Sequence, residues 1–136
     1  MYQIIMNENR SRNDVLILLE FMPIIQSILK TRDMLMWFLS VDNFVETLVL
    51  CAFIKNNQII IDCFTYLSII CNIEDGYNQV VNAFDDFMIF AQEKTRFQSV
   101  ITLLRTASDS EVVITLLVFF NTLIEKSLSV AQRMAV

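Results

Sequence analysis

The chain has 136 residues, 55% of them hydrophobic, and a formal net charge of −5 at pH 7. This length supports one hydrophobic core and is too short for two independent domains. One Gly, one Pro and no His exclude a phosphate-binding loop and the Ser–His–Asp or Cys–His catalytic arrangements, and leave little turn chemistry for a sheet. We therefore expect an all-α protein that is not an enzyme and has no cofactor or metal site.

Apolar residues recur at three- and four-residue spacing along most of the chain, which predicts successive helices joined by short turns. The polar segment 1–12 is expected to fray at the N-terminus. The predicted helices cover residues 13–31, 33–40, 42–54, 57–72, 76–92, 95–106 and 109–126. The candidate N-cap residues are Asp42, Asn57, Asp75, and Ser108 or Asp109. Because no long linker separates these helices, we expect residues 13–136 to form a single domain, an α-solenoid of the armadillo or HEAT type.

Three of these helices carry more specific expectations. Pro23 is expected to kink the first helix or to start its second half, because its ring removes a backbone hydrogen bond. Apolar residues within 77–91 share one face and leave Asp85 and Asp86 outside. Residues 112–124 are apolar nearly all round, which is typical of a central helix covered on several sides. The predicted core contains Phe84, Phe87, Phe97, Leu104, Leu116 and Phe120.

The three cysteines, Cys51, Cys63 and Cys71, all lie in apolar stretches. Their odd number and the absence of His argue against a disulfide framework and against a zinc site. We therefore expect them to be buried and to act as small hydrophobic side chains.

The most apolar runs are residues 15–29, 59–73 and 112–124. Each is shorter than the roughly 20 apolar residues that cross a bilayer, or carries Asp, Glu or Pro inside. The first residues also lack the pattern of a secretory signal. We expect buried helices, no membrane span and a cytoplasmic location; the alternative is a small helical membrane protein that uses these three runs as spans.

Charge is unevenly distributed along the chain. Residues 33–93 contain nine acidic residues and a single basic one, Lys55. An acidic middle argues against nucleic acid as a partner and favours a basic protein segment. The alternative is that these carboxylates only solvate the outer faces of the helices.

The segment TYLSIICNIEDGYNQVVNAFDDFMIFAQEKTRFQSVITLLR combines a helix that ends in Cys, a Gly-containing turn, an AF–DF helix and a helix that starts with RF. This order resembles the armadillo-repeat regulatory region of diaphanous-related formins, the GBD/FH3 region. The matching positions are Leu67, Ser68, Cys71, Gly76, Val80, Ala83, Phe84, Phe87, Glu93, Arg96, Phe97 and Leu104. The similarity continues through Phe120, Asn121, Leu123, Ile124 and Arg133, and covers most of residues 27–134.

The resemblance implies a non-enzymatic regulatory module associated with the cytoskeleton. In such formins the armadillo array binds a C-terminal autoregulatory peptide, which is amphipathic and flanked by basic residues, and a Rho-family GTPase weakens that binding. Actin is then only an indirect partner. A helical scaffold solenoid with an unrelated protein partner has the same helix pattern and is the alternative.

Four positions carry over to the peptide groove of that family: Lys30, Thr65, Ile69 and Asn72. Ile69 is bulky where the family commonly has Ala, and Asn72 is polar where the family is apolar. Lys30 adds positive charge where a basic peptide would approach. Each of these departures is expected to weaken the docking of such a peptide.

Overall fold

The computed structural model describes residues 12–41, 44–85 and 95–134, and within these ranges the side chains of 16–127. This part of the chain contains seven α-helices and no strand. The helices are α2 (Arg12–Leu29), α3 (Arg32–Leu39), α4 (Phe44–Cys51), α5 (Asn57–Ile70), α6 (Glu74–Phe84), α7 (Arg96–Thr106) and α8 (Ser110–Met134). The predicted all-α class is therefore confirmed.

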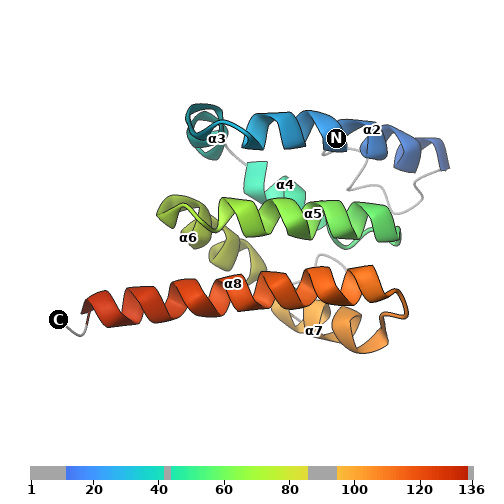
Figure 1. Ribbon diagram of the computed structural model, residues 1–136. Helices are drawn as coiled ribbons and strands as arrows, with labels where there is room; N and C mark the ends of the chain where they lie inside the picture. The colour runs from blue at the N-terminus through green and yellow to red at the C-terminus, as the bar shows by residue number, and fades with distance from the viewer. Residues whose placement is uncertain (1–11, 42–43, 86–94, 135–136) are drawn as a thin grey trace.

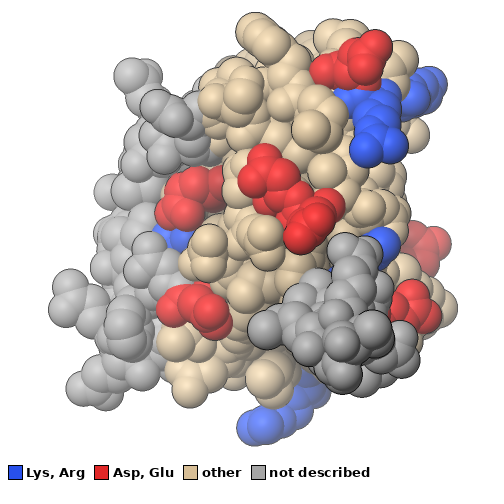
Figure 2. All heavy atoms as spheres, turned by 90° about the vertical axis from the view of Figure 1, so that its left-hand side faces the viewer, with Lys and Arg blue, Asp and Glu red and all other residues tan. Residues whose placement is uncertain are grey.

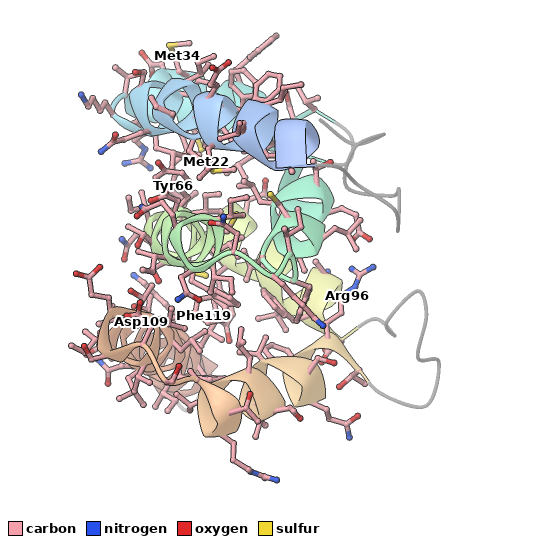
Figure 3. All side chains as sticks on the ribbon, turned by 90° about the vertical axis from the view of Figure 1, so that its right-hand side faces the viewer. Met22, Met34, Tyr66, Arg96, Asp109 and Phe119 are labelled. Atoms are coloured by element: carbon pink, nitrogen blue, oxygen red, sulfur yellow. The ribbon has the colours of Figure 1, made fainter. Side chains whose placement is uncertain are left out.

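The three longest helices form one layer. Figure 1 shows α2, α5 and α8 side by side, all running in the same direction. Figure 3 shows that α4, α6 and α7 lie together on one side of this layer. α5 is central, since it contacts α2, α8, α4 and α6. The Tyr66 phenol donates a hydrogen bond to the Met22 carbonyl oxygen at 3.0 Å and links α5 to α2. The Asn57 amide donates to Asp109 Oδ2 at 3.3 Å and links α5 to the start of α8.

The centre of the core is an aromatic cluster contributed by α5, α6 and α8. The ring of Phe64 lies 6.1 Å from that of Phe84 and 5.1 Å from that of Phe119, and the latter two are 5.4 Å apart, centroid to centroid. All three side chains are fully buried. Offset or edge-to-face aromatic pairs at these separations add to the free energy of burial, so this cluster holds the two layers together.

The predicted core is confirmed in part. Of the predicted residues, Phe84 and Leu116 are fully buried, while Phe97, Leu104 and Phe120 are half-buried and pack against the core. Phe87 lies outside the described residues. The fully buried phenylalanine of α8 is Phe119 rather than Phe120, because the face of α8 that meets α5 follows the spacing Val112, Leu116, Phe119.

The prediction that residues 112–124 form a helix covered on several sides is wrong. α8 runs on to Met134, and Ile114, Leu117, Val118 and Ile124 are each between 51% and 60% exposed. The reason is its position, since α8 lies at the edge of the three-helix layer (Figure 1). It packs against α5 on one side and α7 on another, and the rest of its apolar surface faces outward.

α6 begins and ends earlier than predicted. It runs from Glu74 to Phe84, with Ile73 rather than Asp75 at the N-cap. Glu74 and Asp75 instead occupy the first turn, where carboxylates interact favourably with the helix dipole. The rest of the predicted helix 76–92, including Phe87, falls in 86–94, which lies outside the described residues.

Most other boundaries agree with the predictions within about two residues, the usual uncertainty of helix ends. The N-cap of α5 is Asn56 and not Asn57, since Asn56 Oδ1 accepts the Ile59 backbone N–H at 3.0 Å. α4 ends at Cys51, three residues before the predicted end, and Asp42 lies outside the described residues. α2 continues through Pro23, so this residue does not start a new helix.

Cys51, Cys63 and Cys71 are buried and free, as predicted. Among the described residues, no single helix is long and apolar enough to cross a membrane. The bent pair formed by α3 and α4, with an angle of 92° between them, reaches the length and composition of a broken span.

Candidate functional site

An open groove of about 360 Å³ runs between α5 and α8. Its lining comprises Thr65, Ser68 and Ile69 from α5, Asn72 from the turn after α5, and Ile114, Thr115, Val118 and Thr122 from α8. Residues spaced by three and four positions share one face of a helix, which explains why each helix contributes a continuous wall. We call this site the α5–α8 groove.

The α5–α8 groove brings together three of the four residues that the sequence pointed to. Thr65, Ile69 and Asn72 all line it. Lys30 does not line the groove. It is exposed in the turn that follows α2, and α2 is the neighbour of α5 in the same layer. The structure therefore brings Thr65, Ile69 and Asn72 together and leaves Lys30 apart from them.

The α8 wall of the groove was missed by the sequence reasoning. Ile114 and Val118 lie one helical turn apart and are 60% and 52% exposed. The sequence signal was too weak to separate them from the core, because residues 112–124 are apolar on nearly every side. Thr115 and Thr122, which lie beside these positions, could have indicated the exposed face of α8, since hydroxyl side chains favour a face that is not fully buried.

The hydroxyl groups of the lining are bound to their own helices. Thr65 Oγ1 donates to the Ile61 carbonyl oxygen at 2.7 Å, and Ser68 Oγ donates to that of Phe64 at 2.8 Å. On α8, Thr115 and Thr122 make the same i−4 bond, at 2.7 and 2.9 Å. Their donors are thus used, while each hydroxyl oxygen keeps lone pairs that can accept a hydrogen bond. The groove suits apolar side chains with occasional hydrogen-bond donors.

Ile69 stands in the groove as an exposed apolar group. Its side chain is 38% exposed, and it faces Ile114 and Val118 across the groove. The structure places Ile69 on the α5 wall of the groove. Its methylenes therefore narrow the groove without being packed in the core.

The Asn72 end of the groove lies next to an acidic surface. Asn72 follows α5 in the turn to α6, and Glu74 and Asp75 start α6 two and three residues later. Figure 2 shows acidic side chains spread over this end of the molecule, with basic groups mainly at its edges. Exposed carboxylates raise the local concentration of a basic segment and steer its approach. The groove thus combines an apolar channel with an acidic end.

Three hydrogen bonds fix the helices that form the groove. Asp109 Oδ1 accepts the Glu111 backbone N–H at 2.8 Å, which caps α8 as predicted, while Asp109 Oδ2 accepts the Asn57 amide. On α5, the bond from Tyr66 to Met22 is buried. Burial, reinforced by the charge of Asp62, raises the pKa of the Tyr66 phenol to about 12. The phenol therefore stays neutral and keeps its donor at physiological pH.

A second polar cluster joins α4, α6 and α7 behind the groove layer. Arg96 is only 3% exposed; its Nη1 donates to the Ala83 carbonyl oxygen at 2.9 Å and its Nη2 pairs with Glu46 Oε1 at 2.8 Å. Among the described residues, the Arg96 Nε has no hydrogen-bond partner. Figure 3 shows Arg96 at the start of α7, on the side away from the groove. Its role is to anchor α7 against the other two helices.

The described residues include no group of three or more His, Cys, Asp or Glu that would hold a metal ion. The neighbouring Cys51 thiol and burial raise the pKa of Cys63 well above its ordinary value, and burial raises that of Cys71 to about 12. Thiols that stay protonated are poor nucleophiles, so these cysteines serve packing.

Comparisons with protein-family models, with curated proteins and with solved structures find no match to this chain. The formin resemblance therefore stays a prediction carried by the residues that display it.

Proposed function

We propose that the chain is an armadillo-like helical module that binds an amphipathic helical segment of a protein partner in the α5–α8 groove. The observation that carries this proposal is the meeting of Thr65, Ile69 and Asn72 with Ile114 and Val118 around one open apolar channel. A helix that docks in such a groove contributes apolar side chains at positions i, i+3, i+4 and i+7. The groove supplies matching apolar walls along two parallel helices.

The order of the helices supports the armadillo-like architecture. α2, α5 and α8 run in the same direction, and each successive pair is separated in sequence by two shorter helices. Such a regular alternation is typical of a solenoid, in which the longer helix of each repeat lines a shared surface. Solenoids of this kind present extended surfaces to protein partners.

The most specific form of the proposal is a formin-type regulatory module. Its partners are a C-terminal autoregulatory peptide with apolar anchors and a basic flank, and a Rho-family GTPase that weakens the docking of that peptide. The resemblance of residues 27–134 to the formin GBD/FH3 region supports these partners, and it also implies a cytoplasmic location near the cytoskeleton. The acidic surface beside Asn72 supports the basic flank.

A peptide titration tests the proposal. A fluorescent formin-type autoregulatory peptide is titrated with the parent chain, with Val118→Asp and with Trp37→Asp as a matched control. Val118 and Trp37 are both exposed, at 52% and 62%, and only Val118 lines the groove. We expect Val118→Asp to abolish binding and Trp37→Asp to preserve it. Absence of binding by the folded parent would favour a scaffold with an unrelated partner.

A further inference from the structure

The outward face of α8 carries a regular stripe, which shares Ile114 with the α5–α8 groove but none of its other residues. Ile114, Leu117, Asn121 and Ile124 are all exposed, and their spacing of three, four and three residues is that of alternating a and d positions in a heptad. The next position in the sequence, Leu128, continues the spacing within the helix. We call these four residues the outer stripe of α8.

The outer stripe is opposite the face that holds α8 in the fold. Val112, Leu116 and Phe119 are buried against the core, and they alternate along the helix with the outer stripe. α8 therefore has two apolar faces, one satisfied within the molecule and one not. An exposed apolar stripe on a helix that is already folded marks a surface for association.

We propose that the outer stripe is the interface of a parallel two-stranded coiled coil between two copies of this chain. The two α8 helices would lie alongside each other about a two-fold axis, with identical residues meeting in each layer. Three observations select a second copy as the occupant: the heptad spacing, the polar residue within the stripe and the charges beside it.

The polar residue is Asn121, at an a position between apolar layers. A single Asn at such a position specifies register and favours two strands, because the two amides hydrogen-bond to each other across the axis. In the single chain, the Asn121 amide donates to Glu125 Oε1 at 3.2 Å on the surface of its own helix. Pairing with a second Asn121 gives the buried amide a partner in the dimer.

The charges beside the stripe select the parallel orientation. Glu111 and Glu125 occupy e positions, one before and one after the centre of the stripe. In an antiparallel pair the e positions of the two copies face each other, so Glu111 of one copy would stand near Glu125 of the other and repel it. In a parallel pair the e positions lie next to the g positions, which are Val113, Phe120 and Ser127.

The outer stripe spans about one and a half heptads, which is short for isolated helices. α8 is already ordered by its packing on α5 and α7. Dimer formation therefore does not include the entropic cost of ordering this helix. We therefore expect a reversible dimer that forms as concentration rises.

Sedimentation velocity over a concentration series tests the association. We expect the parent chain to shift from monomer to dimer, and Leu117→Glu and Ile124→Glu each to raise the dissociation constant by at least about tenfold, because each buries a charge in an apolar layer. Neither residue lines the α5–α8 groove. The matched control is Ile24→Glu on α2, since Ile24 is 57% exposed and Ile124 59%. A parent that stays monomeric, or a dimer that only Ile24→Glu disrupts, would overturn the proposal.

Oxidative cross-linking tests the orientation. Ile124→Cys places two thiols in one layer of a parallel pair, whereas in an antiparallel pair centred on the stripe they stand about 15 Å apart along the axis. An azo oxidant takes up the two thiol hydrogens as the disulfide forms. The native cysteines are fully buried, and Asn82→Cys, exposed on α6, is the control. Rapid dimer formation by Ile124→Cys alone is expected; equal cross-linking of both variants would refute the parallel pair.

Discussion

The guanidinium of Arg96 and the carboxylate of Glu46 form an ion pair of 2.8 Å that joins the start of α7 to α4. Arg96 is almost completely buried, whereas the Glu46 side chain is 32% exposed. Removal of the acid leaves the buried cation uncompensated, which is more costly than loss of the pair as a whole. Substitutions at this ion pair therefore test how strongly α7 is anchored to α4.

We expect Glu46→Leu to lower the free energy of unfolding by about 3 kcal/mol, the lower end for a broken buried pair, because Glu46 is partly solvated. The double variant Glu46→Leu with Arg96→Met should recover much of that loss. Urea unfolding of the single and double variants gives the coupling energy in a double-mutant cycle. Losses that simply add would show that the two side chains act independently.

Gly76 is the single glycine of the chain and lies where α6 begins to pack on the end of α5. A Cβ at this position would overlap the Ile70 carbonyl oxygen and come within 2.8 Å of Ile70 Cγ2. We expect Gly76→Ala to destabilise the protein by about 1–3 kcal/mol, the usual cost of overpacking. Asn78→Ala, exposed on the same helix, is the control. If Gly76→Ala does not change the free energy of unfolding, α5 and α6 are less closely packed at Gly76 than in this structure.

Phe119 and Phe120 are adjacent in α8 but differ in burial. Phe119 contacts Phe64 and Phe84 and is fully buried, whereas Phe120 is half-buried. Phe119→Ala should therefore cost about 3–5 kcal/mol of unfolding free energy, and Phe120→Ala less. Chemical denaturation of both variants checks the order. A larger loss for Phe120→Ala would show that α8 is rotated relative to this packing.

The Tyr66 phenol has a pKa of about 12, because it is buried and because the negative charge of Asp62 is near. A group whose pKa is raised in the folded state contributes stability that is present below its unfolded pKa, near 10, and is lost as pH rises toward 12. Absorbance titration should show one tyrosine that ionises late, and Tyr66→Phe should remove that step. Stability of the parent should fall between pH 10 and 12 more steeply than that of Tyr66→Phe.

We expect the α5–α8 groove to bind a formin-type peptide more tightly when its residues are replaced by those typical of diaphanous-related formins. Ile69→Ala removes methylenes that narrow the groove, and Asn72→Ile replaces an amide by an apolar group. Each change should tighten binding by about tenfold, the effect of roughly 1.4 kcal/mol. Because Ile69 is 38% exposed, its truncation should change stability little. Fluorescence anisotropy checks the affinity while circular dichroism reports folding.

The same titration at rising salt examines the acidic end of the groove. Exposed charges are screened beyond about 10 Å at 0.1 M salt, so binding of a peptide with a basic flank should weaken as salt increases. An affinity that is constant over this range would remove electrostatic steering from the proposed mechanism.

The amino-acid sequence determined the helices and much of the core, because these depend on local spacing and on cap residues. The burial of Phe84 and the cap at Asp109 both follow from patterns within a few residues of each position. The sequence did not distinguish Asn56 from Asn57 as the cap of α5, because both side chains can accept the capping hydrogen bond. It also missed that α6 starts after Ile73, since this helix begins without a side-chain cap for the sequence to reveal.

The tertiary structure alone decided which apolar residues stay outside. Val118 and Phe119 are neighbours of similar hydrophobicity, yet one is half exposed in the groove and the other is fully buried. Local spacing cannot separate them where a helix is apolar on nearly every side, since the difference arises from which helices lie beside α8. Because α5 and α7 cover only part of its surface, the rest of α8 forms the groove wall and the outer stripe.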